Sequence, residues 1–155
     1  MSLISELKKY SKLKSEADMK CFSDIVRKMA ASKNNRYISV ILLYLDDESE
    51  HIDLMNVLIG MAESFNSVDY VQCVLDNIEA LNKFAPDWLE HITYRITNSE
   101  DYSNTYKALL KTHPNSDAIR RFLINFSKAN PEKNTVIKSI VEDDNLRSLC
   151  RRPHL

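Results

Sequence analysis

The sequence predicts an all-α protein of about nine short antiparallel helices, arranged as an irregular α-solenoid of the HEAT type or as a compact helical bundle. Two observations carry this prediction. Apolar residues recur at intervals of three and four along most of the chain, which is the period of one helix face. The 155 residues include one glycine and four prolines, too few for the glycine-rich turns of β-hairpins and for glycine-rich phosphate-binding loops.

Polar residues mark the start of most of the predicted helices, since Ser, Thr, Asp and Asn cap the first turn. No clean sequence repeat is present, so we expect the helix pairs to stack irregularly. The expected helices are, in order, one over residues 2–13, one capped by Ser15, one starting at Asn34 or Asn35, one opened by a capping box from Asp47 to Glu50, one capped by Ser67 that continues through Leu81, one with Pro86 in its first turn, one capped by Ser99, one from Ser116, and one started by Asn130 and Pro131.

The length predicts a single domain over residues 1–155, with a loose tail over 145–155. A chain of this size buries roughly 70% of its unfolded surface, so it needs no disulfide or metal for stability. No run of eighteen apolar residues is present, and the start lacks the apolar segment of a secretory signal. The three cysteines are widely separated, which fits a reducing compartment. We therefore expect a cytoplasmic protein with no membrane contact.

Charge is segregated along the chain. The stretch YLDDESEHIDLM, residues 44–55, holds five carboxylates within eight positions. Residues 46–101 contain thirteen Asp or Glu and only two Lys or Arg, whereas the segments on either side are both basic, and the formal net charge of the whole chain is −1. A local field of one sign attracts partners of the opposite sign. The acidic middle segment therefore indicates a basic partner.

The acids of the predicted fourth and sixth helices recur at spacings of three and four, and alternate helices of a stack face the same side. The predicted fifth helix, with Asp76 and Glu79, would face away. Gly60 costs about 1 kcal/mol relative to Ala within a helix and would let a partner approach closely. The candidate partner-binding face therefore comprises Asp46, Asp47, Glu50, Asp53, Asn56, Gly60, Glu63, Glu90, Tyr94 and Asn98.

A helix start is the simpler explanation for part of this charge. Carboxylates in a first turn are stabilised by the helix dipole by roughly 0.3–1 kcal/mol, which accounts for Asp47 and Glu48 without a partner. It does not account for Asp53, Glu63 or Glu90, which lie beyond that turn. A merely solvated face usually mixes both signs of charge, and this segment does not.

The sequence contains no recognisable catalytic, metal or cofactor site. His51, His91, His113 and His154 are isolated, and neither HExxH nor CxxC is present, so we expect no metal and no cofactor. No GxSxG motif is present for a serine nucleophile. Nucleic acid would be repelled by the acidic middle segment. We therefore expect a binding protein that is not an enzyme and does not contact nucleic acid directly.

Several stretches resemble the bacterial immunity protein 30 family, over roughly residues 20–141. They are LDDESEH at 45–51 with Leu54, Met55 and the ESF of 63–65 after it, APDWLEHITYRITNSE at 85–100, and ANP at 129–131. The resemblance implies a helical cytoplasmic protein that binds and blocks the C-terminal toxin domain of a contact-dependent growth inhibition effector, in a 1:1 complex. Many such toxins are nucleases with basic, phosphate-binding active sites.

These implications give roles to the candidate face. Its carboxylates would pair with toxin Lys and Arg as a phosphate mimic, and Tyr94 would be an aromatic anchor. The alternative is a helical-repeat scaffold or adaptor that binds another basic protein.

Overall fold

The computed structural model describes residues 2–142, and over these residues the chain forms helices and no strand. The all-α prediction is confirmed, while the tail predicted over 145–155 lies outside the described residues. The elements, in order, are α1 Leu3–Tyr10, α2 Glu16–Ala31, α3 Arg36–Leu42, α4 Ile52–Glu63, α5 Ser67–Asp76, α6 Ile78–Phe84, α7 Pro86–Thr97, α8 Glu100–Leu110, α9 Ser116–Ala129, the 3-10 helix η1 Pro131–Lys133, and α10 Asn134–Val141.

Local capping decides where several helices begin. The hydroxyls of Ser15 and Ser99 each accept a hydrogen bond of 3.1 Å from the N–H three residues later, as predicted for the caps of α2 and α8. Pro86 opens α7, also as predicted. The cap of α5 is Asn66 and not Ser67, because the Asn66 side chain accepts from the N–H of the third residue beyond it at 2.9 Å.

The helix predicted to continue through Leu81 is interrupted, and this part of the prediction is wrong. It is divided at Asn77 into α5 and α6, so the described residues hold ten α-helices instead of about nine. The Asn77 amide donates to the carbonyl of Cys73 at 2.7 Å and to the hydroxyl of Ser39, on α3, at 2.9 Å. A side chain that bonds the preceding turn competes with the continuing helix. The contact with α3 fixes the break.

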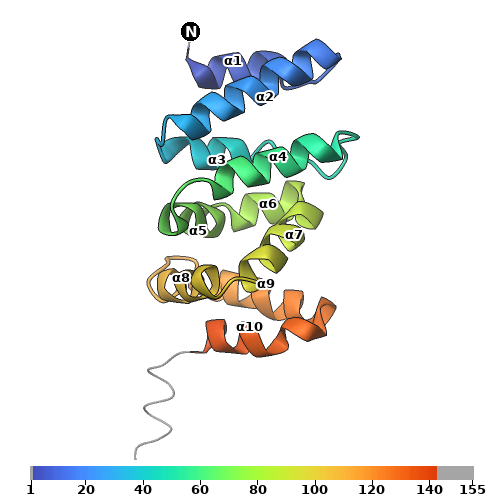
Figure 1. The fold of residues 1–155 in the computed structure, drawn as a ribbon. Coiled ribbons are helices and arrows are strands. Elements are labelled where there is room, and N and C mark those ends of the chain that lie inside the picture. Colours follow the sequence, from blue (N-terminus) through green and yellow to red (C-terminus); the bar gives the residue numbers. More distant parts are fainter. Residues whose placement is uncertain (1, 143–155) are drawn as a thin grey trace, which may run out of the picture. The chain divides into compact units, whose positions relative to one another are not determined.

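The chain separates into two compact units, with the boundary between Ile92 and Thr93, inside α7. In the first unit α1 packs on α2, α2 on α3 and α4, and α3 on α4 and α5. Figure 1 shows α1 beside α2 and α3 beside α4 in successive layers. Packing between each helix and the second helix after it is typical of stacked helix pairs. The assignment of residues 1–155 to one domain remains a prediction.

The core of the first unit comes from the apolar stripes that the spacing predicts. On α2, for example, Phe22, Val26 and Met29 are at most 1% exposed. Burying a side chain of this size stabilises the fold by about 1.5–3 kcal/mol. The ring of Phe22 meets the ring of Tyr44 edge to face, with centroids 5.4 Å apart. Partial burial raises the pKa of the Tyr44 hydroxyl.

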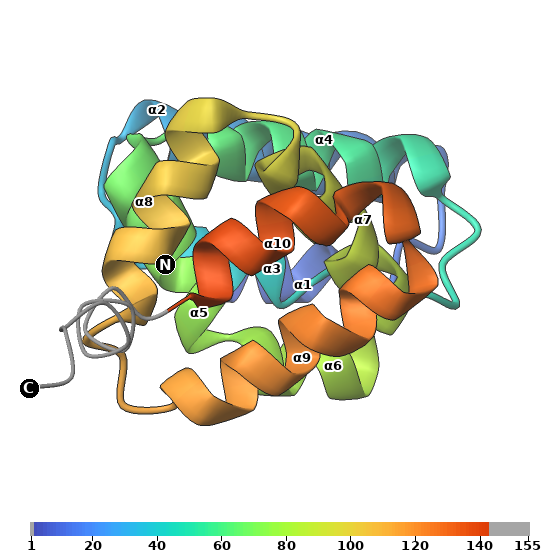
Figure 2. The ribbon, with the colours of Figure 1, turned by 90° about the horizontal axis from the view of Figure 1, so that it is seen from below.

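In the second unit, α10 packs against both α8 and α9, and η1 packs against α9 and α10. Figure 2 shows α10 lying between α8 and α9. The buried side chains again follow helical spacing, with Ile119, Leu123 and Phe126 on α9 and Ile137 and Ile140 on α10. This unit therefore has an apolar centre of its own.

We predict that Tyr106→Phe stabilises the protein. Tyr106 is 1% exposed, and its hydroxyl has no hydrogen-bond partner within residues 2–142. Leaving a buried polar group unpaired costs about 1–3 kcal/mol. Removing the hydroxyl should raise the free energy of unfolding by about 1 kcal/mol, as measured by urea denaturation.

Tyr94→Phe is the matched control, because the Tyr94 hydroxyl donates to Glu132 Oε1 at 3.0 Å. Its stability should stay equal or fall. A clear loss of stability in Tyr106→Phe would show that this hydroxyl is satisfied.

Candidate partner-binding face

The first unit holds eight of the ten candidate residues, and the second unit holds Tyr94 and Asn98. The candidate acids of the first unit lie on the loop of residues 43–51, which joins α3 to α4, on α4 itself, and on the first turns of α7.

The Asp47 side chain on the 43–51 loop caps helix α7. Its carboxylate accepts hydrogen bonds from the N–H groups of Asp87 at 2.9 Å and of Trp88 at 3.2 Å, across 40 and 41 residues. Pro86 is the first residue of α7 and has no N–H, and Ala85 before it has no side-chain acceptor. The second and third N–H groups of the helix therefore need an acceptor from elsewhere, and Asp47 supplies it.

The predicted capping box from Asp47 to Glu50 is therefore wrong. Helix α4 begins at Ile52, and its N-cap residue is His51, with no side-chain cap hydrogen bond. The spacing of Asp47 and Glu50 suits a capping box, but the chain turns once more before the helix begins. Asp47 is drawn to the uncapped start of α7 instead, and Glu50 is left exposed.

One further contact holds the 43–51 loop against α7, and others order each side of this junction. The Trp88 indole Nε1–H donates to the carbonyl of Asp46 at 3.2 Å. The Asp46 carboxylate accepts from the N–H of Glu48 at 2.9 Å, which closes a local turn. The Trp88 ring also meets His91 of α7 edge to face at 5.6 Å. The loop thus has a fixed course beside the start of α7.

Several acids of this region project into solvent. Asp46, Glu48, Glu50 and Asp53 are all exposed, and none of them pairs with a Lys or Arg in the part of the chain that the structure describes. Asp53 lies in the first turn of α4, where the helix dipole favours it, so the expectation that it lies beyond the first turn is wrong. The other three lie on the loop, outside any helix, so the dipole of α4 does not account for the whole group.

The remaining candidates of the first unit continue along α4 and α7. Asn56 and Gly60 are exposed on α4, Glu63 is half-buried at its end, and Glu90 is exposed on α7. A Cβ added to Gly60 would meet no atom within 4 Å. The chain itself therefore does not require glycine at this position, and close approach by a partner stays a prediction.

A shallow groove of about 500 Å³ runs beside the acids of α4. It is lined by residues of α2, of the end of the 43–51 loop and of the start of α4. Two of the candidate acids line it, Glu50 from the loop and Asp53 from α4. The sequence analysis missed the contribution of α2, because no local pattern shows which residues of α2 lie against α4. The lining residues are Met19, Lys20, Ser23, Glu50, His51, Ile52, Asp53, Leu54 and Val57.

In the second unit, Tyr94 and Asn98 already take part in contacts within the unit. The Tyr94 hydroxyl donates to Glu132, and this hydrogen bond, with burial and the Glu132 charge, raises the pKa of Tyr94. The ammonium group of the buried Lys133 lies 4.2 Å from the centre of the Tyr94 ring and donates to Oδ1 of the Asn98 side chain. The two residues thus hold α7 to η1, and their contact with a partner stays a prediction.

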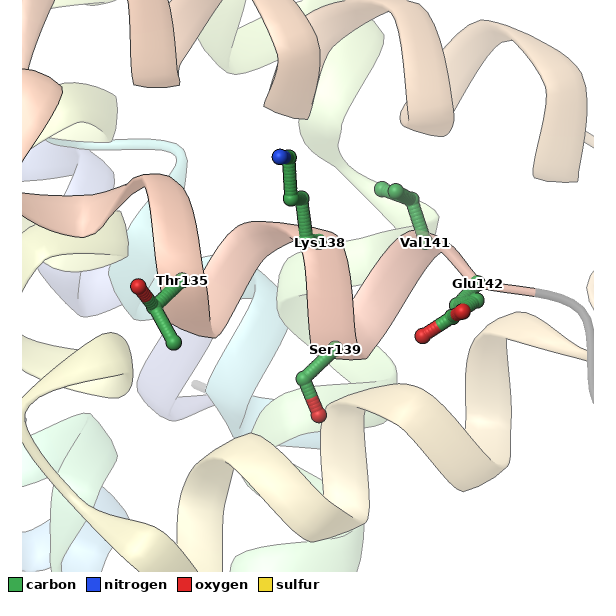
Figure 3. Close-up of a pocket in the computed structure, with 5 residues that line it drawn as sticks. All are labelled: Thr135, Lys138, Ser139, Val141 and Glu142. Carbon is green, nitrogen blue, oxygen red and sulfur yellow. The ribbon is translucent and has the colours of Figure 1, made fainter.

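A second hollow, of about 540 Å³, lies on α10 in the second unit. Figure 3 shows its five lining side chains, with Lys138 and Val141 on one side of the helix and Thr135 and Ser139 on the other. The fifth is Glu142, so both signs of charge are present. None of the candidate residues lines this hollow.

No assembled chemistry is found in the described residues. No group of three His, Cys, Asp or Glu side chains among residues 2–142 is placed to hold a metal ion. Burial, followed by the charges of Asp76 and Asp69, raises the pKa of the Cys73 thiol, although a hydrogen bond with Ser39 opposes the shift. A thiol with a raised pKa is a poor nucleophile. No helix of this part of the chain has the length and apolar character needed to span a bilayer.

The geometry of the described residues defines a class of protein, namely a helical protein that presents exposed carboxylates on a hydrogen-bonded loop and on the helix after it. The chain belongs to the Immunity protein 30 family, because the model of that family matches residues 9–106, more than half of the chain. The matched residues include the 43–51 loop and the 85–100 stretch, whereas the ANP at 129–131 lies beyond them. Comparisons with curated proteins and with solved structures gave no match.

We predict that Asp47→Ala lowers the free energy of unfolding by about 1–2 kcal/mol, because two N–H groups of α7 lose their acceptor. Asp53→Ala, on the exposed surface of α4, should change it by no more than about 0.5 kcal/mol. Urea denaturation of both variants measures the difference. Equal stabilities of the two variants would contradict a capping role for Asp47.

Proposed function

We propose that the protein neutralises a toxin domain by binding it, and that it has no catalytic activity of its own. Membership of the Immunity protein 30 family carries this proposal. The exposed carboxylates of Asp46, Glu48, Glu50 and Asp53 support it, since they provide a surface that attracts a basic protein.

The proposed toxin is a basic nuclease, the C-terminal domain of a contact-dependent inhibition effector, bound in a 1:1 complex in the cytoplasm. A nuclease active site is basic because it holds phosphate. Carboxylates on a rigid support can occupy such a site as phosphate mimics, and charge complementarity speeds association. The acids of the 43–51 loop are held by hydrogen bonds to α7, so they lose little freedom on binding.

The proposed contacts follow from which candidate carboxylates are exposed and which are already hydrogen-bonded within the chain. Asp46, Glu50 and Asp53 are exposed and provide the negative charge, whereas the Asp47 carboxylate is occupied by α7. Asn56, Gly60, Glu63 and Glu90 extend the proposed contact along α4 and α7. Asp47 therefore positions the contact surface and makes no direct contact with the toxin.

A helical-repeat adaptor for another basic protein is the second candidate. The packing of α2 on α4 and of α3 on α5 favours it, because adaptors often stack helix pairs in this way. The position of the partner's gene separates the two functions, since an immunity protein is encoded beside its toxin.

We predict that co-expression with the toxin domain encoded by the adjoining gene restores growth to cells that this toxin kills. The purified protein alone should show no hydrolytic activity. Death of cells in which both proteins are soluble and abundant would rule out the immunity function.

We also predict that charge reversal on α4 slows toxin binding. Asp53→Lys with Glu63→Lys changes one acid in the first turn and one at the end of the helix. At low salt the association rate should fall about tenfold, and the difference should shrink as salt screens the charges.

The control is Glu79→Lys with Asp76→Lys, which changes an acid in the first turn of α6 and one at the end of α5. Both double variants carry the same total charge. Equal loss of association rate in the two variants would show that net charge, and not the α4 surface, attracts the toxin.

A further inference from the structure

The groove between α2 and α4 combines an apolar surface with two carboxylates. Ile52, at the start of α4, is 53% exposed, which is unusual for a large apolar side chain beside a groove. Met19 and Val57 are half-buried along the groove, and Leu54 is 8% exposed. A groove with exposed apolar atoms and a few polar groups is the common form of a binding site.

Glu50 and Asp53 line the same groove, and neither pairs with a Lys or Arg of residues 2–142. The start of α4 contributes a partial positive charge of about one half. Two full negative charges exceed it, so the acids still favour a cation. The His51 side chain makes no cap hydrogen bond at this helix start.

We propose that this groove receives an arginine side chain of the toxin, an inference that rests on the proposed immunity function. The guanidinium group binds Glu50 and Asp53, and the arginine stem lies along Ile52, Met19 and Val57. Arginine fits better than lysine, because its planar group is weakly hydrated, pairs with carboxylates through two hydrogen bonds and lies flat on apolar surface. Arg is also enriched among the residues that dominate binding energy.

Lys20 lines the same groove and opposes the binding of a cation. Its charge offsets one of the two carboxylates, so a basic side chain that lacks apolar contacts gains little there. Lys20 therefore acts as a specificity residue, because it weakens unselective attraction between the groove and basic proteins.

The test uses the full chain and the toxin domain encoded by the adjoining gene, with affinity measured by calorimetry. Glu50→Gln should weaken binding at least roughly thirtyfold, as expected when one partner of a desolvated charge pair is removed. Glu48→Gln is the control, because Glu48 is an exposed acid of the same loop that does not line the groove. It should change the affinity by less than about twofold.

Two further pairs test the apolar surface and the opposing charge. Ile52→Ala should weaken binding roughly fivefold. The control is Val68→Ala, which should have no effect, because Val68 lies on α5 and is 54% exposed, about as much as Ile52. Lys20→Ala should strengthen binding about threefold through lost repulsion. Lys28→Ala, which removes the same charge from α2 at a different groove, should leave the affinity unchanged.

The possible results distinguish failure of the arginine-groove proposal from failure of the proposed immunity function. If the toxin binds the unaltered chain but the groove variants match their controls, the groove assignment is overturned and the immunity function stands. If the toxin does not bind the unaltered chain, both are overturned. If the chain forms a dimer in sedimentation that Glu50→Gln abolishes, a second copy occupies the groove and the arginine assignment is overturned.

Discussion

Helix α7 begins at Pro86, after Ala85, and neither residue can accept a hydrogen bond through its side chain, so the carboxylate of Asp47 accepts from the first N–H groups of the helix instead. The candidate face depends on this contact. It fixes the 43–51 loop, and the Asp46 carbonyl and the Trp88 indole strengthen the same junction. Without it, the acids of the loop would sit on a free connection between α3 and α4 and would lose conformational entropy on binding.

The acidic stretch that the sequence shows as one cluster therefore has two physical roles. Asp47 is half-buried and stabilises the start of α7, and Asp46 both shapes the loop and remains exposed. Glu50 and Asp53 neither cap α7 nor shape the loop, and they line a groove. Of the two explanations that the sequence left open, the helix cap holds for Asp47, and the binding surface stays a proposal for the exposed acids. The cap belongs to α7 and not to α4.

The sequence was sufficient for features with a local cause. Helical spacing identified the buried stripes, and Ser15 and Ser99 marked their helix starts because a cap reaches only three residues along the chain. The sequence was insufficient where a residue forms its hydrogen bond with a residue far away along the chain. The break at Asn77 depends on Ser39, and the cap of α7 depends on Asp47, so neither has a local signature. The groove needed the position of α2 against α4, which periodicity does not give.

Contacts with distant residues also explain why the sequence misjudged the surroundings of Tyr94 and Asn98. On sequence they continue the polar stripe of α7, but the buried Lys133 holds both of them in the second unit. Burying a lysine is costly unless its charge is compensated, and the Tyr94 ring and the side-chain oxygen of Asn98 provide that compensation. The polar stripe of one helix can therefore serve folding at one end and remain exposed to solvent at the other. On α7 the transition falls between Glu90, which remains exposed beside the first turns, and Tyr94, whose hydroxyl and ring are engaged by η1. The acids near the 43–51 loop are consequently better candidates for toxin contact than the polar residues at the end of α7.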